Sequence, residues 1–301
     1  MMVFHGVLGK PTKTWILSIG DGLKTVYYEI KDNAGRVSQY TDTIGLDTVN
    51  PTGSIIINNG DVWANSTNVF LLLSYNDVTS GISEVRYSND GITWSSWEAA
   101  NPTKAWVLST GDSSSKTVYY EIRDNAGRVS QYTDTIGLDT VNPTGSIIIN
   151  NGDLWTNSIN VLLTLTYNDI ISGVLEVRYS NDGITWSSWE AANPTKAWVL
   201  STGDSSSKAV YYEIKDNAGR VSQFYDTIGL DTIDPTGSVL INNGDVWTNS
   251  TNVILTSTYN DITSGVLEVR YSNDGISWSS WEAANPTKAW VLSTGDSSSK
   301  A

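Results

Sequence analysis

Short runs in which apolar and polar residues alternate cover most of the chain. In residues 116–124, KTVYYEIRD, the side chains of Val118, Tyr120 and Ile122 fall on one face of an extended chain and the intervening residues on the other. This period of two is typical of a strand with one buried face. The same pattern, together with runs of β-branched residues, predicts seven strands in residues 51–142, namely 53–59, 68–75, 83–88, 92–99, 104–109, 116–124 and 128–138.

Turn residues separate these runs. The segments 89–91 (NDG) and 124–127 (DNAG) supply residues that tolerate a positive φ, so the chain can reverse direction after 83–88 and after 116–124. No stretch has the period of an amphipathic helix. The pattern therefore predicts an all-β protein built from short strands.

The pattern itself repeats along the chain. The segment PTGSIIINNGD begins at Pro51 and again at Pro143, and PTGSVLINNGD begins at Pro235, so the period is 92 residues. A solenoid unit is about 20 to 50 residues long, whereas this period suits a small domain with its own core. The repeats predict four parts: a partial domain with only the C-terminal strands, two complete domains, and a partial domain that lacks the last two strands, at 1–50, 51–142, 143–234 and 235–301.

The two partial domains leave two interpretations open. In the first, the chain is a fragment of a longer repeat array, since a domain cut after residue 301 lacks two strands of its sheet. In the second, residues 235–301 of one chain pair with residues 1–50 of the next and build a head-to-tail fibre by strand complementation. Here we expect weak association at most, because Trp15 and Trp290 lie on equivalent predicted strands and one copy would have to be displaced.

Seven short strands in a domain of about 90 residues are typical of an immunoglobulin-like or fibronectin type III-like sandwich. The segments SEVRYSNDGITW, WVLSTGDSSSKTVYYEIRDNAGRVS and LDTVNPTGS resemble the tandem Ig-like repeats of large bacterial and archaeal surface proteins and adhesins. The resemblance covers essentially the whole chain and implies an all-β tandem array of Ig-like/fibronectin type III-like β-sandwich domains. It also implies a stalk, spacer or adhesive module at an extracellular or cell-surface location.

The amino-acid composition disfavours several classes of partner and site. The chain has 32 Asp and Glu against 18 Lys and Arg, a net charge of −14, so its field repels phosphate backbones and anionic membranes and disfavours nucleic acid as a partner. The absence of cysteine excludes disulfides and thiolate metal sites. No run of about 18 apolar residues could span a bilayer. Residues 1–15 lack the apolar block of a signal peptide, so an export signal would lie outside this sequence.

Catalytic chemistry has little support in the sequence. His5 is the only histidine and lies outside the complete repeats, so a Ser-His-Asp arrangement could occur at most once and a repeated histidine metal site cannot occur. Glu84 and Glu121 fall on predicted outward faces, where a solvated surface role is favoured over acid–base catalysis. Gly91 and Gly127 fall at turns and not in a phosphate-binding strand-to-helix loop. We therefore expect no enzymatic activity and no required cofactor.

Aromatic residues are mostly of the kinds that carry a polar group, with 13 Trp and 15 Tyr against 3 Phe. Trp94 and Trp97 are three residues apart, so on a regular strand one would point into the core and the other toward solvent or a neighbouring domain. Trp106 is expected inside. Core and edge packing is the simpler interpretation. The alternative is a glycan-stacking platform repeated along the array, formed by Trp94, Trp97, Trp186, Trp189, Trp278 and Trp281.

Carboxylates are expected to converge at the domain junctions. No Gly- or Ser-rich linker separates the repeats, and Pro143 biases Asn142 toward an extended conformation, so the junction should be stiff. The chain direction through a sandwich brings the linker, the loop after 68–75 and the turn after 116–124 to one pole. Oxygen atoms gathered there would suit calcium, and the simpler alternative is that each aspartate caps its own turn. The candidate ligands are Asp47, Asn50, Asp77 and Asp124 at one junction and Asp139, Asn142, Asp169 and Asp216 at the next.

Three functions remain open at this point. We favour a non-catalytic structural segment of an extracellular surface or adhesin-type protein, a stiff stalk or spacer, because it accounts for the repeats and the short junctions. A glycan-binding module would account for the tryptophans, and an accessory region of a secreted enzyme would account for both. The expected partners are the neighbouring repeats of the same chain and surface glycans or proteins.

Overall fold

The computed structural model describes residues 12–294, and its regular structure there is almost entirely β. Strands alternate with turns, and the helical segments of these residues are single turns of 3₁₀ helix, the first at Asn58–Gly60. The chain forms two compact units, Met1–Thr140 and Val141–Ala301. Each unit combines one complete sandwich with an incomplete neighbouring repeat, and the four-part division predicted from the sequence stays a prediction.

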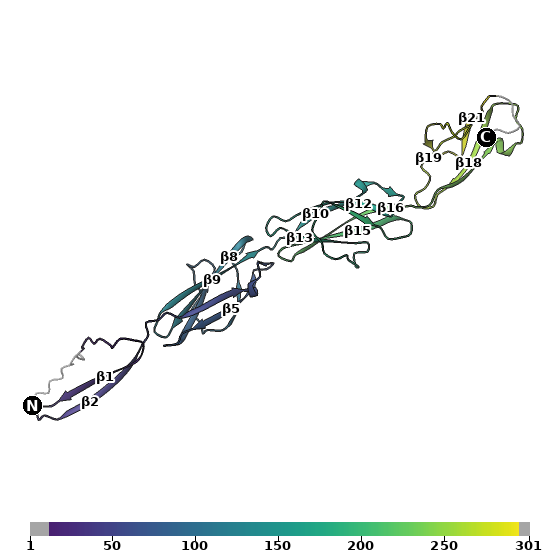
Figure 1. The fold of residues 1–301 in the computed structure, drawn as a ribbon. Coiled ribbons are helices and arrows are strands. Elements are labelled where there is room, and N and C mark those ends of the chain that lie inside the picture. The colour runs from purple at the N-terminus through teal and green to yellow at the C-terminus, as the bar shows by residue number, and fades with distance from the viewer. Residues whose placement is uncertain (1–11, 295–301) are drawn as a thin grey trace, which may run out of the picture. The chain divides into compact units, whose positions relative to one another are not determined.

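The first unit begins with a hairpin and continues into a complete two-sheet sandwich (Figure 1). Strand β1 pairs antiparallel with β2 in the hairpin. One sheet of the sandwich has the order β3-β5-β7 and the other the order β4-β9-β8-β6. The bounds are β1 (Gly22–Lys31), β2 (Val37–Leu46), β3 (Thr52–Ile57), β4 (Trp63–Ala64), β5 (Asn68–Asn76), β6 (Ile82–Ser88), β7 (Thr103–Val107), β8 (Ser113–Asp124) and β9 (Val129–Leu138).

The apolar positions predicted from the alternation form the core between these two sheets. Val118, Tyr120 and Ile122 of β8 are completely buried, as are Val85 of the neighbouring strand β6 and Leu71 of β5 in the opposite sheet. Because successive side chains of a strand point to opposite faces, the residues between them lie outward. The inward assignment made from the sequence is therefore confirmed for this strand.

The edges of the sandwich are closed by contacts that the pattern did not predict. The carboxylate of Asp134 on β9 accepts a hydrogen bond of 2.7 Å from the backbone N–H of Ile57 on β3, which links the two sheets. Strand β4 pairs parallel with the end of β9, where the ring of Trp63 lies against Gly137 so closely that a Cβ there would come within 2.3 Å of it. Glycine is therefore required at residue 137 for the strand and the ring to pack.

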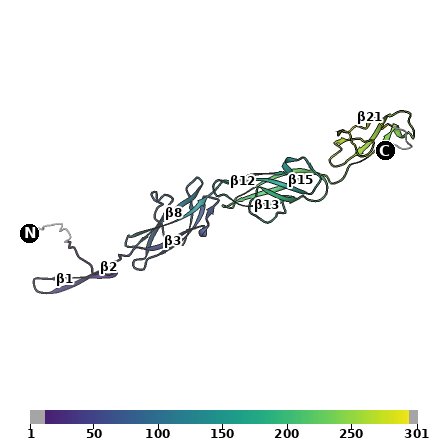
Figure 2. The ribbon, with the colours of Figure 1, turned by 45° about the horizontal axis from the view of Figure 1, so that its top comes forward.

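The second unit repeats this arrangement and then begins a third copy (Figure 2). Its complete sandwich has the sheets β10-β12-β14 and β11-β16-β15-β13, and the third copy has the sheets β17-β18-β21 and β19-β20. The bounds are β10 (Thr144–Ile149), β11 (Trp155–Thr156), β12 (Asn160–Asn168), β13 (Val174–Ser180), β14 (Thr195–Val199), β15 (Ser205–Asp216), β16 (Val221–Leu230), β17 (Thr236–Ile241), β18 (Asn252–Asn260), β19 (Glu268–Val269), β20 (Glu282–Ala283) and β21 (Thr287–Val291).

One predicted strand is wrong. Residues 92–99 form no strand; they contact β6 through an isolated bridge between Val85 and Glu98 and through a backbone bond of 2.9 Å from the N–H of Ser95 to the carbonyl of Tyr87. The reason is local: Asp90 bonds the backbone N–H groups of Ile92 and Thr93, which holds the start of the segment in a turn. A chain bent in this way cannot align its backbone groups with β6 over a longer stretch.

Candidate metal centre

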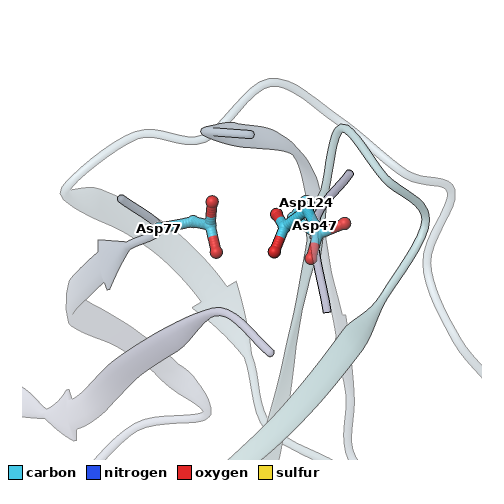
Figure 3. A group of neighbouring side chains, drawn as sticks. All are labelled: Asp47, Asp77 and Asp124. Atoms are coloured by element: carbon cyan, nitrogen blue, oxygen red, sulfur yellow. The ribbon is translucent and has the colours of Figure 1, made fainter. Parts of the chain in front are cut away.

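Three aspartates from separate segments of the first unit meet at one pole of its sandwich. Asp47 follows β2 in the linker, Asp77 follows β5, and Asp124 ends β8. One carboxylate oxygen from each lies within 4.8 Å of the other two. Figure 3 shows Asp77 facing Asp124 and Asp47 across the gap between them. The fold thus brings together three of the four candidate ligands predicted for this junction, as the chain direction required.

The carboxylates of Asp77 and Asp47 also accept hydrogen bonds from the chain around them. Oδ1 of Asp77 accepts hydrogen bonds from the N–H groups of Thr79, Ser80 and Gly81 at 3.1, 2.8 and 2.9 Å, so it caps the loop between β5 and β6. Asp47 accepts a bond from the hydroxyl of Ser80 through Oδ2. This hydroxyl, and to a smaller extent the charge of Arg128, holds the pKa of Asp47 below its ordinary value, so its carboxylate stays ionised.

Asp124 differs because one of its oxygens is buried without a partner. Oδ1 accepts the backbone N–H of Arg128 at 2.8 Å, as a turn cap does. Oδ2 has no hydrogen-bond donor among the described residues, although the residue is only 1% exposed. Leaving a buried carboxylate oxygen unpaired is costly, so such an atom indicates a missing partner. A cation held between this oxygen and the other two carboxylates would supply that partner, so the residues present fit calcium.

The fourth candidate, Asn50, has a different contact. Its Oδ1 accepts a hydrogen bond of 2.9 Å from Nη1 of Arg128, and Nε of the same guanidinium donates to the backbone carbonyl of Asp47 at 3.2 Å. Arg128, a residue of the following repeat, therefore holds the linker through two hydrogen bonds. The linker is also held from the preceding side, because Asp21 accepts bonds from the N–H and hydroxyl of Thr48 at 3.0 and 2.9 Å.

The candidates at the next junction belong to different units. Asp139 lies in the first unit and Asn142, Asp169 and Asp216 in the second. Within the second unit, Asp169 caps its loop through the N–H groups of residues 171–173, and Oδ1 of Asp216 accepts the N–H of Arg220 at 2.8 Å. These caps repeat those of Asp77 and Asp124. The calcium site at this junction stays a prediction.

Several residues of the site were missed by the sequence reasoning. Ser80 and Arg128 make polar contacts to Asp47 that no sequence motif predicted. A further pair of aspartates, Asp231 and Asp261, both accept the N–H of Ser264, at 3.1 and 2.8 Å. The 92-residue period could have identified this pair, because it makes Asp231 and Asp261 equivalent to the predicted ligands Asp139 and Asp169.

His5 lies outside the described residues.

The predicted division of Trp94 and Trp97 between core and surface is wrong. Both rings contact the guanidinium of Arg86, whose Cζ lies 4.7 Å from the centroid of Trp94 and 4.4 Å from that of Trp97. Arg123 is 4.3 Å from Trp97 as well. The two rings share one side because residues 92–99 are not a regular strand, so side chains need not alternate. Trp106 does pack against the core, as expected.

The same contacts recur in the other repeats. Arg178 contacts Trp186 and Trp189 at 4.8 and 4.4 Å, and Arg270 lies 4.9 and 4.4 Å from Trp278 and Trp281. The outward glutamates are engaged too, since Glu121 pairs with Arg86 at 2.7 Å and Glu84 pairs with Arg123. A cation over a ring occupies a face that a sugar would need. Glycan stacking by the six tryptophans stays an untested alternative.

Similar proteins were found among solved structures. No protein-family model and no curated protein matches the chain. Matching solved structures include the fibronectin(III)-like modules of Clostridium thermocellum CbhA, 13% identical, covering 58% of this chain and 94% of that chain at a TM-score of 0.37. A 1.5-MDa bacterial ice-binding adhesin is 16% identical over 80% and 86%, with a TM-score of 0.37. A tetra-tandem repeat from the extending region of a large adhesion protein is 14% identical over 90% and 74%, at 0.30.

The class of the protein follows from its own sheet order. Sheets ordered β3-β5-β7 and β4-β9-β8-β6 form an Ig-like or fibronectin type III-like sandwich, and the second unit repeats it. The chain is therefore a tandem array of such repeats, and the resemblance seen in the sequence is confirmed for the fold. In residues 12–294, no helix has the length and apolar character needed to cross a membrane.

Proposed function

We propose that this chain is a non-catalytic structural segment of an extracellular surface protein, a spacer whose junctions are stiffened by calcium. The observation that carries the proposal is the buried, unpartnered Oδ2 of Asp124 beside Asp47 and Asp77. Asp47 belongs to the linker, whereas the other two belong to the following sandwich. A cation bound by all three would tie the linker to that sandwich.

The donor set supports calcium over smaller or softer cations. Three carboxylates supply hard oxygen ligands, and the remaining positions of a six- to eight-coordinate ion are open to water and backbone carbonyls. Magnesium demands a tighter octahedron and gives up its water reluctantly. Soft ligands play no part, because the chain has no cysteine. We expect affinity in the millimolar range that extracellular modules show.

Calorimetric titration of the full chain with calcium tests this site. We expect a binding heat for the wild type and one calcium fewer per chain for Asp124→Asn, which keeps the bond to Arg128 but removes the buried charge. Asp42→Asn, on the exposed strand β2, removes the same charge elsewhere and should titrate like the wild type. A wild type without calcium heat, or an Asp124→Asn chain that binds as much calcium as the wild type, contradicts the site.

The spacer role needs a separate measurement of shape. Small-angle scattering of residues 51–234 with and without calcium compares the maximum dimension across the junction between the two complete repeats. We expect calcium to narrow the distribution of distances and to leave the circular dichroism of the sandwiches unchanged. An unchanged maximum dimension, together with no calcium heat in calorimetry, would leave the junction aspartates as turn caps alone.

A further inference from the structure

The outward face of the sheet β3-β5-β7 has an apolar centre. On β5, the side chains of Phe70 and Leu72 point away from the core and are 42% and 40% exposed. Leu72 stands opposite Ile56 of β3, and Phe70 stands opposite Ala105 of β7. Val107 lies two residues further along β7 on the same face and is exposed as well. These five residues form one continuous surface, which we call the outer patch.

The surroundings of the outer patch are polar but carry no charge. Along the described strands β3, β5 and β7, none of the outward side chains is charged. Lys104 of β7 points to the other side, where its ammonium pairs with Glu98 at 2.7 Å. The rim of the patch consists of Ser54, Asn68, Ser74 and Thr103. Interfaces between proteins have a centre depleted in charge and a polar rim, so this composition favours an interface.

The outward face of the other sheet of the same sandwich is charged. It carries the ion pairs of Arg86 with Glu121 and of Arg123 with Glu84. The two faces therefore suit different surroundings. Water and ions stabilise the charged face, whereas the outer patch gains from contact with another apolar surface.

The outer patch recurs in the other repeats with different residues and again without charge. In the second unit, Leu162 of β12 takes the place of Phe70, is 46% exposed and stands opposite Ala197. Thr164 takes the place of Leu72. The complete equivalent sets are Ile148, Leu162, Thr164, Ala197 and Val199, and Leu240, Ile254, Thr256, Ala289 and Val291. Because 17% of the chain is charged, side chains that change between repeats yet stay uncharged indicate that the face has to be free of charge.

We propose that the outer patches of two copies of this chain pack against each other, sheet face against sheet face. Two chains of net charge −14 repel each other, and this repulsion opposes contact least where neither surface carries a charge. Burial of apolar side chains then supplies the attraction. A second copy brings the same patch at the same interval of 92 residues, so it offers a partner surface for each repeat of the first.

One pair of patches is too small to hold two chains together. Five half-exposed side chains offer on the order of a few hundred Å², whereas a stable interface buries about 800 Å² on each partner. Linked repeats change this balance, because once one pair of patches is in contact the next pair forms at a high effective concentration. Association is therefore expected to need patches from more than one repeat.

Sedimentation equilibrium of the full chain over a wide range of concentration tests the proposal. A chelator in the buffer keeps calcium from bridging acidic chains, so the result does not depend on the proposed calcium site. We expect the mass of the wild type to rise with concentration from 32.8 kDa toward twice that value. Salt should strengthen the association, because it screens the repulsion between two acidic chains while the patch itself has no ion pairs to weaken.

Charged substitutions test whether the association uses the outer patch. A chain with Phe70→Glu, Leu162→Glu and Ile254→Glu has like charges on both faces and should associate at least tenfold more weakly than the wild type. A second chain with lysine at these three positions should be equally weak alone. Mixing the two chains should restore association, because opposite charges then meet. Phe70→Glu alone should have a smaller effect than the triple substitution.

The matched control adds the same three charges away from the patch, as Ile92→Glu, Ile184→Glu and Ile276→Glu. These side chains are 83% to 84% exposed, so the control chain should associate like the wild type. Circular dichroism of each variant checks that the repeats stay folded. The proposal is overturned by a wild type that stays monomeric, by a glutamate chain that associates as well as the control chain, or by a mixture that stays as weak as its two components.

Discussion

Aspartate is the residue that shapes this protein most at the scale of single side chains. Asp90 caps the turn after β6, where its Oδ1 accepts the N–H groups of Ile92 and Thr93 at 2.8 and 2.7 Å and the hydroxyl of Ser88 at 2.8 Å. These bonds, led by that from Thr93, lower the pKa of Asp90 to about 2. Acidic residues here are therefore structural as well as solubilising.

The lowered pKa of Asp90 predicts a pH-dependent effect of its substitution. Because the pKa is lower in the folded than in the unfolded chain, the ionised group stabilises the fold above pH 3.8, and this stabilisation is lost as the pH falls toward about 2. We expect Asp90→Asn to lower the melting temperature of its repeat at neutral pH and to have no effect near pH 2. Calorimetric unfolding measures both, with Asp61→Asn, an exposed residue, as the control. A difference that persists unchanged at pH 2 contradicts this.

Elements in this protein follow their sequence pattern where a strand has neighbours on both sides. Strand β8 lies between β9 and β6, and its alternation was predicted correctly. The segment after β6 has no such neighbours, and its two tryptophans instead pack on Arg86. Arg86 in turn pairs with Glu121 on β8. Cation–π contacts thus add to the few backbone hydrogen bonds that this stretch makes with β6.

Removal of this guanidinium is expected to loosen the segment. Arg86→Leu keeps an apolar stem but loses contact with both rings and the ion pair, which we expect to cost about 1 to 2 kcal/mol. Unfolding in urea measures this cost, and tryptophan emission should shift to longer wavelength as the rings gain water. Arg36→Leu is the matched control because the guanidinium of Arg36 pairs with the exposed carboxylate of Asp32 and, among residues 12–294, stacks on no aromatic ring. Equal stability of the two variants would show that the rings are held by other contacts.

The molecule as a whole is made of units whose cores are separate. The core of the first sandwich draws its buried residues from 55–138, and the core of the second from 147–228. The third repeat has the same first strands, but of the apolar residues described in 235–294 only Val253 and Leu255 are buried. We therefore expect a repeat to fold independently when both of its sheets have all of their strands, whatever the length of the chain.

This predicts different behaviour for fragments of the array. Residues 51–142 should unfold cooperatively and give dispersed amide resonances, because both of their sheets are complete. Residues 235–301 alone should do neither, since an open core face and an unpaired edge remain. Denaturant unfolding and a two-dimensional amide spectrum of each fragment measure this. Cooperative unfolding of monomeric 235–301 would show that the first strands suffice for a stable fold.

The sequence by itself determined the repeat period, the all-β class and the buried side of the long strands. These depend on the two-residue period of a strand and on turn residues such as those at 124–127, which act over short distances along the chain. The convergence of linker, loop and turn aspartates also followed, because strand direction fixes which ends meet.

Only the tertiary structure decided contacts between side chains distant in sequence. That Oδ2 of Asp124 is left without a partner depends on every neighbour that could have donated a bond, and no local motif encodes that. The link from Asp134 to Ile57 joins residues 77 positions apart. The placement of Trp94 and Trp97 on Arg86 required a bend in the chain, and a pattern of alternation assumes that the chain is straight.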